Sequence, residues 1–439
     1  MSSRTLPLPE HPDRRQVSDE VHARPYPLMR APEQASHLAV LSVEGSAAAD
    51  HATLAGLCRR LGCAAPPPGA NHFAAAVDGL QLRWERHTEF TSYTFIRPLE
   101  GADPFAEPAI RAVPEDWVAA LPEAVLVAVH AALLPAPAGW RGGGLPPEFE
   151  PHFASANVSG SLMTGGAAAG WTDFVIREDG FSRILVIDMG LRERQAGRLV
   201  QRLLEIETYR TMALLALPVA REISPQLDRL DRAVTETAGR IAGVSDIGSQ
   251  RALLGTLTGQ AAEIERLVNG STYRFGAARA YCALVDRRIA ELREQRIEGL
   301  QTVAEFMERR LAPAMRTCES TTARLEALAQ RVGRASNLLR TRVDIELEAQ
   351  NRDVLKSMNR RARLQLRLQE TVEGLSVVAI SYYAVGRVGY AAKAAKAAGA
   401  PIDIELATGL AIPVVIGGVW LMIRRIRRRL LRRGEDEPD

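Results

Sequence analysis

Histidines are the residues of this chain best able to do chemistry, and all eight of them precede residue 153. One of them stands in a regular pattern, because Glu85, His87 and Glu89 occupy alternate positions. Alternate residues of a β-strand face the same side of a sheet, so we expect these three side chains to lie together. Two carboxylates beside an imidazole could bind a metal ion or act as an acid–base pair. The pattern is also typical of a polar brace, since no recognised metal-binding spacing accompanies it.

A second, weaker candidate is His22, which lies in the polar run Asp19-Glu20-Val21-His22-Ala23-Arg24-Pro25. We interpret residues 1–35 as an ordered N-terminal arm held by salt bridges and a proline turn. The glycine-rich stretch SGSLMTGGAAAG at 159–170 lacks the lysine of a phosphate-binding loop, so we expect a turn there. No motif for a cofactor or for nucleic acid occurs, and we predict neither as a ligand.

Short apolar runs separated by turn signals dominate residues 36–190. Several of these runs alternate apolar and polar residues, which is typical of half-buried strands. The step Asp78-Gly79 joins two of the runs and is typical of a hairpin turn. We therefore predict an α/β domain over residues 36–190 with a largely antiparallel sheet.

Helix-forming residues dominate 191–373, where proline occurs only at positions 218, 225 and 313. Apolar residues such as Leu199 and Leu203 recur at steps of three and four, so each helix must bury one face. We predict a stalk of long helices with coiled-coil character, including one from Pro313 to Glu373. The complete chain is thus predicted to be an α+β protein.

Two apolar segments follow within 374–423, which we predict to be two transmembrane helices forming a hairpin. Leu406–Ile423 carries no charge, whereas Leu375–Ala392 contains Arg387, which could reach an interface or a polar cavity. Arginines flank both outer ends, and the positive-inside rule places those ends in the cytoplasm. The basic tail 424–439 supplies the residues that we expect to fix this topology, namely Arg424, Arg425, Arg427, Arg428 and Arg429.

Two features of these apolar segments predict helix packing. Tyr382 and Tyr383 lie in the middle of the first segment, where a phenol needs a hydrogen-bond partner, so one side should face protein or water. Gly409, Pro413 and Gly417 recur every four residues in the second segment and form a face of small residues. Such a face could pack within the hairpin of one chain or between subunits.

The charge of the 439-residue chain is divided unevenly. Residues 1–190 hold 14 Arg, no Lys and 22 acidic residues, whereas residues 191–439 hold 41 basic and 30 acidic residues. The two parts therefore carry net charges of −8 and +11, as expected of modules with different surroundings. Four cysteines do not make a disulfide framework, which favours a reducing compartment.

Long phrases of the sequence resemble the DUF3422 family of uncharacterised bacterial membrane-anchored proteins. The phrases are HPDRRQVSDEVHARP (11–25), WERHTEFTSYTF (84–95), GWTDF (170–174), VQRLLEIETYRTMALLALP (200–218), RRLAPAMRTCEST (309–321), LLRTRVDIELEAQN (338–351) and RLQETVEGLSVVAISYYAVG (367–386). The resemblance covers nearly the whole chain and implies attachment to the bacterial inner membrane, but it implies no particular activity.

These observations favour a multi-pass inner-membrane protein with most of its chain in the cytoplasm. We expect an oligomeric scaffold or sensor, in contact with the lipid bilayer and assembled from identical chains through the stalk and membrane helices. The architecture resembles that of CorA-type ion channels, which is a first alternative, although YYAVGRVGYAAKAAK stands where those channels carry Gly-Met-Asn. A second alternative is an enzyme or metal site around His87 and Glu89.

Overall fold

The computed structural model describes residues 9, 11–14, 18, 25–42, 45–140, 142–153, 158–399, 401 and 403–433, with side chains as far as residue 426. The chain divides into two units. Unit 1 comprises Met1–Val244 and Ala252–Ser336, and unit 2 comprises Ser245–Arg251 and Asn337–Asp439. About half of the predicted N-terminal arm, including His22, lies outside the described residues.

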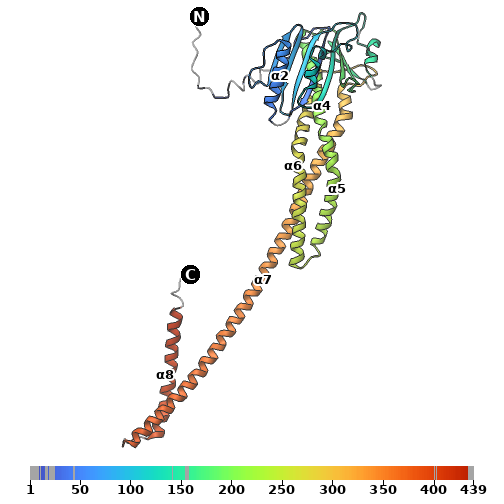
Figure 1. Cartoon of the computed structure of the whole chain (residues 1–439). Helices are drawn as coiled ribbons and strands as arrows, with labels where there is room; N and C mark the ends of the chain where they lie inside the picture. Colours follow the sequence, from blue (N-terminus) through green and yellow to red (C-terminus); the bar gives the residue numbers. More distant parts are fainter. Residues whose placement is uncertain are drawn as a thin grey trace. The chain divides into compact units, whose positions relative to one another are not determined.

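A mixed sheet forms one end of unit 1, and long helices extend from it (Figure 1). In the part of the chain that is described, its nine strands lie in the order β2-β3-β4-β1-β5-β8-β7-β6-β9. All neighbouring strands are antiparallel except β5 and β8, which confirms the prediction of a largely antiparallel sheet. The strands are β1 (Glu33–Leu41), β2 (His72–Val77), β3 (Leu80–Arg86), β4 (Phe90–Pro98), β5 (Val125–Pro135), β6 (Ser159–Met163), β7 (Ala168–Thr172), β8 (Ser182–Asp188) and β9 (Gln295–Arg296).

The turn predicted for 159–170 occupies only residues 164–167, and the residues on either side of it form strand β6 and the start of β7. Strand β6 is difficult to predict from the sequence, because its small residues lack the β-branched or aromatic character that is usual in strands. The glycines of this hairpin have a steric role: a Cβ at Gly160 of β6 would lie 2.3 Å from the Trp171 ring, and one at Gly170 of β7 would lie 2.9 Å from Met163. The glycines therefore make room for two large buried side chains.

The two faces of the sheet differ in character around β1, β3 and β4. Leu38, Tyr93 and Trp84 join a hydrophobic cluster that also contains Leu54 and Leu57 of helix α2 (Ala47–Leu61). Their strand neighbours alternate to the opposite face, where the side chains are more polar. That second face packs against helix α4 (Glu193–Leu214), and it contains the candidate site.

Long helices account for most of the remaining chain (Figure 1). After a short helix α3 (Glu115–Ala119), the main helices are α4, α5 (Ala216–Ile241), α6 (Ile247–Leu292), α7 (Val303–Ala397) and α8 (Ile404–Arg433). The predicted apolar face of α4 is buried, as Leu199 and Leu203 are 1% and 4% exposed.

Helix α7 begins ten residues before Pro313, so the predicted start is wrong. Thr302 and Glu305 form a reciprocal cap, since each backbone N–H donates to the other's side chain. The Glu294 carboxylate also accepts from the N–H groups of Val303 and Ala304, at 2.9 Å each. These caps satisfy the first free N–H groups, and the helix tolerates the proline in its interior.

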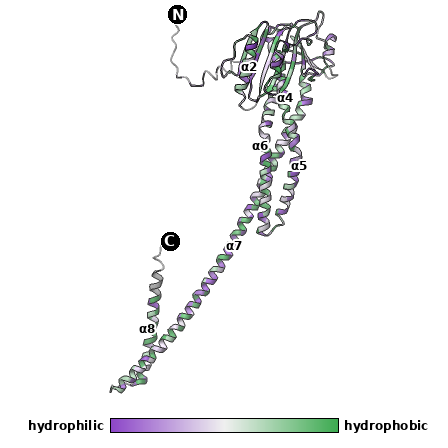
Figure 2. Ribbon diagram, in the orientation of Figure 1, coloured by the Kyte–Doolittle hydropathy of each residue, from purple (hydrophilic) through white to green (hydrophobic). Residues whose placement is uncertain are grey.

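Unit 2 contains the C-terminal part of α7 and all of α8, which contact each other. A Cβ at Gly389 would lie 3.7 Å from Thr408, and Ser381 and Ala392 are buried. Figure 2 shows hydrophobic residues along α8, whereas hydrophobic and hydrophilic residues alternate along α7. The described residues contain one helical segment long and apolar enough to cross a membrane, Ile404–Ile426, where two had been predicted.

Candidate functional site

The pattern Glu85, His87, Glu89 does not lie on one strand, which corrects the sequence prediction. Strand β3 ends at Arg86 and β4 begins at Phe90, so Glu85 is on the strand and the other two are in the connection. The backbone N–H of His87 donates to the carbonyl oxygen of Phe90 at 2.8 Å and closes the hairpin. No Gly or Asn-Gly step marks this turn, and the sequence therefore reads as one continuous strand.

Glu89 points to helix α6. Its two carboxylate oxygens accept hydrogen bonds from the two terminal nitrogens of Arg274, at 2.8 and 3.0 Å. Burial, together with the neighbouring Glu89 carboxylate, raises the pKa of the Tyr281 phenol on the same helix. Because both oxygens of Glu89 engage the guanidinium, this residue ties the hairpin to α6.

His87 instead lies beside Glu85, with 3.7 Å between His87 Nε2 and Glu85 Oε2. Its ring stacks on Phe90 with 4.2 Å between the ring centres. Glu85 also lies 3.5 Å from the guanidinium of Arg83. Of the three residues of the motif, the structure thus brings two together, and it directs Glu89 to a different partner.

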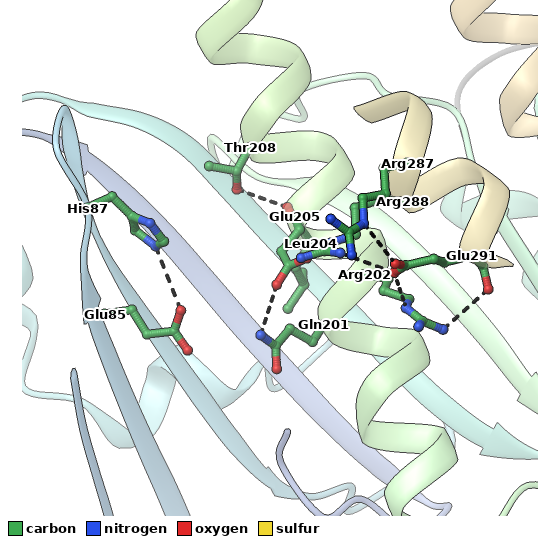
Figure 3. A network of polar contacts seen from close by, with 10 residues as sticks. All are labelled: Glu85, His87, Gln201, Arg202, Leu204, Glu205, Thr208, Arg287, Arg288 and Glu291. Carbon is green, nitrogen blue, oxygen red and sulfur yellow. Dashed lines mark hydrogen bonds and ion pairs between the residues drawn. The ribbon is translucent and has the colours of Figure 1, made fainter. Parts of the chain in front are cut away.

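A small cavity lies between this part of the sheet and α4. Its volume is about 40 Å³, and its polar lining includes His37, Glu85, His87, Glu205 and Thr208. Figure 3 shows Glu85 and His87 on the hairpin and Glu205 and Thr208 on the helix. A water molecule needs about 10–15 Å³ measured in this way, so the cavity has room for a few waters.

His37 of β1 is a lining residue that the sequence motif did not include. Thr208 Oγ1 donates to the carbonyl oxygen of Leu204 at 2.9 Å, so its own hydrogen is already used. The contact of 3.1 Å between His37 Nε2 and Thr208 Oγ1 therefore has the histidine as donor. His37 Nδ1 is left to accept from the Thr94 hydroxyl at 2.8 Å. The neutral ring satisfies both partners.

Burial, together with the smaller effect of the charge of His87, lowers the pKa of His37 to about 4. The imidazole of His37 is therefore neutral at physiological pH, in agreement with its hydrogen bonds. The only sequence signal for this role is the Ser36-His37 pair, which lies between apolar residues of strand β1. Such a signal does not identify which helix closes over the ring.

Glu205 connects the cavity with a network of ion pairs between α4 and α6 (Figure 3). It accepts from Gln201 at 2.9 Å and from Arg288, whose charge partly offsets the burial that raises the pKa of Glu205. Arg288 also contacts Glu291 at 3.1 Å, and Glu291 contacts Arg202 at 2.9 Å. The Glu205 carboxylate is thus held by Gln201 and Arg288 on one side, and its other side faces the cavity.

The site has groups that could exchange protons with water, since carboxylates and imidazoles line one cavity. Among the described residues, no group of three His, Cys, Asp or Glu side chains is placed to hold a metal ion. His87 and Glu89 were predicted as a metal-binding pair, but the Glu89 carboxylate is hydrogen-bonded to Arg274 instead.

The predicted membrane residues lie in unit 2. Tyr382 and Tyr383 are exposed, and their neighbour Ser381 is buried. Arg387 is likewise exposed on α7. Arg424 lies over the ring of Trp420, at 4.9 Å from its centre, and Arg425 is exposed. The side chains of Arg427, Arg428 and Arg429 lie outside those that are described.

The face of small residues on α8 does not form the contact with α7. A Cβ at Gly409 or Gly417 would meet nothing within 4 Å, and Pro413 is exposed. The α7–α8 contact instead uses the side of α8 that carries Thr408. Within one chain, this small face is therefore open.

The fold defines an α+β protein with a mixed sheet, unusually long helices and one C-terminal helix apolar enough for a membrane. The chain belongs to the DUF3422 family, described as proteins of unknown function, whose sequence model matches residues 9–430. No curated protein gives a significant match to the sequence.

Proposed function

We propose that this protein is a membrane-anchored, oligomeric scaffold or sensor whose α/β unit is a cytoplasmic binding module. The observation that carries the proposal is the segment Ile404–Ile426, which is long and apolar enough for a span and is not buried against the rest of the chain. Leaving such a helix in water would expose more than 20 mostly apolar residues. A bilayer is the environment that covers this surface.

The ends of the segment fit a membrane interface. Trp420 and Arg424 stack near its C-terminal end, and aromatic and basic residues both favour the boundary between lipid and water. The arginines that follow the segment support a cytoplasmic C-terminus in the bacterial inner membrane. Leu375–Ala392, which contacts α8 through Gly389, supplies the other half of the proposed hairpin, and its arginine-rich approach supports a cytoplasmic start.

The cavity beside His37 and Glu205 supports the role of sensor. Its titratable groups lie on β1, β3, the β3–β4 connection and α4, so a change in their charge would act on the packing between the sheet and the helix. At about 40 Å³, the cavity is much smaller than the several hundred Å³ of an ordinary substrate pocket. This size favours a sensing or bracing role over catalysis.

The anchor is tested by placing arginine in the span. In the double variant Val415→Arg with Val419→Arg, each arginine should cost about 2.5–3.5 kcal/mol of insertion free energy. The double variant should therefore be released from carbonate-washed membranes. Ala349→Arg, on an exposed site of α7, is the matched control and should leave the protein in the membrane fraction. Equal retention of both variants would contradict the anchor.

The hairpin is tested by topology reporters. Reporters at Met1 and after Asp439 should be cytoplasmic, and one inserted at Gly399, in the turn between α7 and α8, should lie on the far side. A cytoplasmic signal at Gly399 would mean that residues 375–392 do not cross the bilayer, and it would contradict the proposed hairpin.

A further inference from the structure

A long stretch of α7 in unit 2 is exposed along its whole length. Every residue from Asn351 to Val372 is exposed, so this part of the helix buries little of its surface within the described chain. The exposed side chains include large apolar ones, such as Val354, Met358 and Leu368 at 56%, 60% and 67% exposure. A single helix with such a surface gains little stability in water unless another surface covers it.

Five of the eight large apolar side chains of this stretch fall on the inner positions of a heptad, and Leu355 and Leu364 flank them, whereas Leu366 lies at an outer b position. In steps of three and four, the inner positions a and d are Asn351, Val354, Met358, Arg361, Gln365, Leu368, Val372 and Leu375. Five of these eight residues are apolar, which is typical of the seam of a coiled coil. A polar Asn at an a position is a known device for fixing the register between identical helices.

Charged residues are segregated from this seam. Residues 351–375 contain nine charged residues, and eight of them occupy the outer positions b, c and f, with Arg361 the exception. The flanking positions e and g carry only uncharged residues: Leu355, Ser357, Ala362, Leu364, Gln369 and Thr371. In two-stranded coiled coils these positions are usually charged and form salt bridges between the helices. The uncharged face here is therefore wider than a two-stranded seam.

From this pattern we infer that residues 351–375 are the contact surface of a parallel bundle of three or more copies of this chain. The parallel direction rests on the proposed membrane anchor, which would orient all copies alike. Each helix would then pack against a neighbour on either side, through a/g and d/e positions. The Arg361 stem would lie along the seam while its guanidinium reaches the rim.

The size of the surface also favours more than two chains. At 1.5 Å per residue, 25 residues span about 37 Å, and a helix about 10 Å wide offers roughly 400 Å² to one neighbour. A stable interface commonly buries about 800 Å² on each partner. Contacts with two neighbours reach that value, and a single neighbour does not. Confinement to a membrane would also raise the local concentration of the copies.

Disulfide cross-linking of the full-length protein in membranes tests the inference. A g position lies beside the following e position of a parallel neighbour, so Ser357→Cys with Ala362→Cys should give a ladder of three or more chains on oxidation. The matched control is Lys356→Cys with Arg363→Cys, both at outer f positions, which should stay monomeric like the parent. The four native cysteines remain in all variants, so the parent chain gives the background.

A ladder that stops at two chains would overturn the bundle of three or more, and equal ladders in the control would overturn the seam itself. Single Val354→Cys and Leu375→Cys variants test direction, because positions at both ends of a seam link to themselves only when the helices are parallel. Membrane fractionation of each sample is independent of these bands. Loss from the membrane with the ladder retained would contradict the anchor alone, whereas membrane retention without any ladder would contradict this inference alone.

Discussion

The carboxylate of Glu89 and the guanidinium of Arg274, 185 positions apart in the sequence, form a two-pronged ion pair at 2.8 and 3.0 Å. Their side chains are only 12% and 18% exposed. The pair fixes the β3–β4 hairpin to α6, and that hairpin carries one wall of the cavity. Its disruption should therefore affect both stability and the geometry of the site.

Arg274→Ala should lower the free energy of unfolding by on the order of 3 kcal/mol, because it leaves a largely buried carboxylate without its partner. Glu89→Gln with Arg274→Gln should cost less than the two single changes together, as expected for residues in direct contact. Urea unfolding followed by tryptophan fluorescence measures both. Additive effects in this cycle would mean that the pair contributes no coupling.

His37 should make stability depend on pH. Its pKa is about 4 in the folded protein and about 6.5 when unfolded, so the unfolded chain binds the extra proton between these values. Stability should therefore fall as the pH decreases from 6.5 to 4, by about 1 kcal/mol per pH unit from this residue.

His37→Gln should reduce that slope in urea unfolding at pH 6.5, 5.5 and 4.5. His51→Gln is a suitable control, because His51 is a surface histidine of α2 whose ring contacts only a backbone carbonyl among the contacts described. An unchanged slope in His37→Gln would show that other groups dominate the acid response.

His87 should act as a brace. His87→Gln removes the stacking on Phe90 and the contact with Glu85, and it should cost about 1 kcal/mol of unfolding free energy. Thr88→Ala, at the exposed next position of the turn, should cost less than about 0.5 kcal/mol.

Any cellular phenotype of His87→Gln should then follow the protein level, measured by immunoblot of membrane fractions. A variant at the parental level that has lost all function would instead assign His87 to a site of chemistry.

Helix α4 should tolerate no charge on its inner face. Leu203→Asp places a carboxylate at a position that is 4% exposed, and it should cost several kcal/mol. Arg352→Ala, on the exposed part of α7, should cost less than about 1 kcal/mol. Thermal unfolding separates the two, and similar melting temperatures would mean that the buried face of α4 has been assigned wrongly.

Local patterns in the sequence were sufficient for much of the fold. Alternation and the Asp78-Gly79 turn predicted β2 and β3, because strand period and turn geometry depend on near neighbours. The spacing of Leu199 and Leu203 predicted the buried face of α4 for the same reason. Strand β6 was missed, because Gly160 is explained only by the Trp171 ring that it accommodates on the paired strand β7.

The candidate site depended on tertiary structure. Sequence spacing identified Glu85 and His87, but it could not show that the chain reverses at His87 and sends Glu89 to Arg274. It also could not place Thr208 over His37, since residues 171 positions apart meet only when α4 packs on the sheet. Periodicity along a chain reports local geometry, whereas a site made by packing depends on contacts that no local pattern encodes.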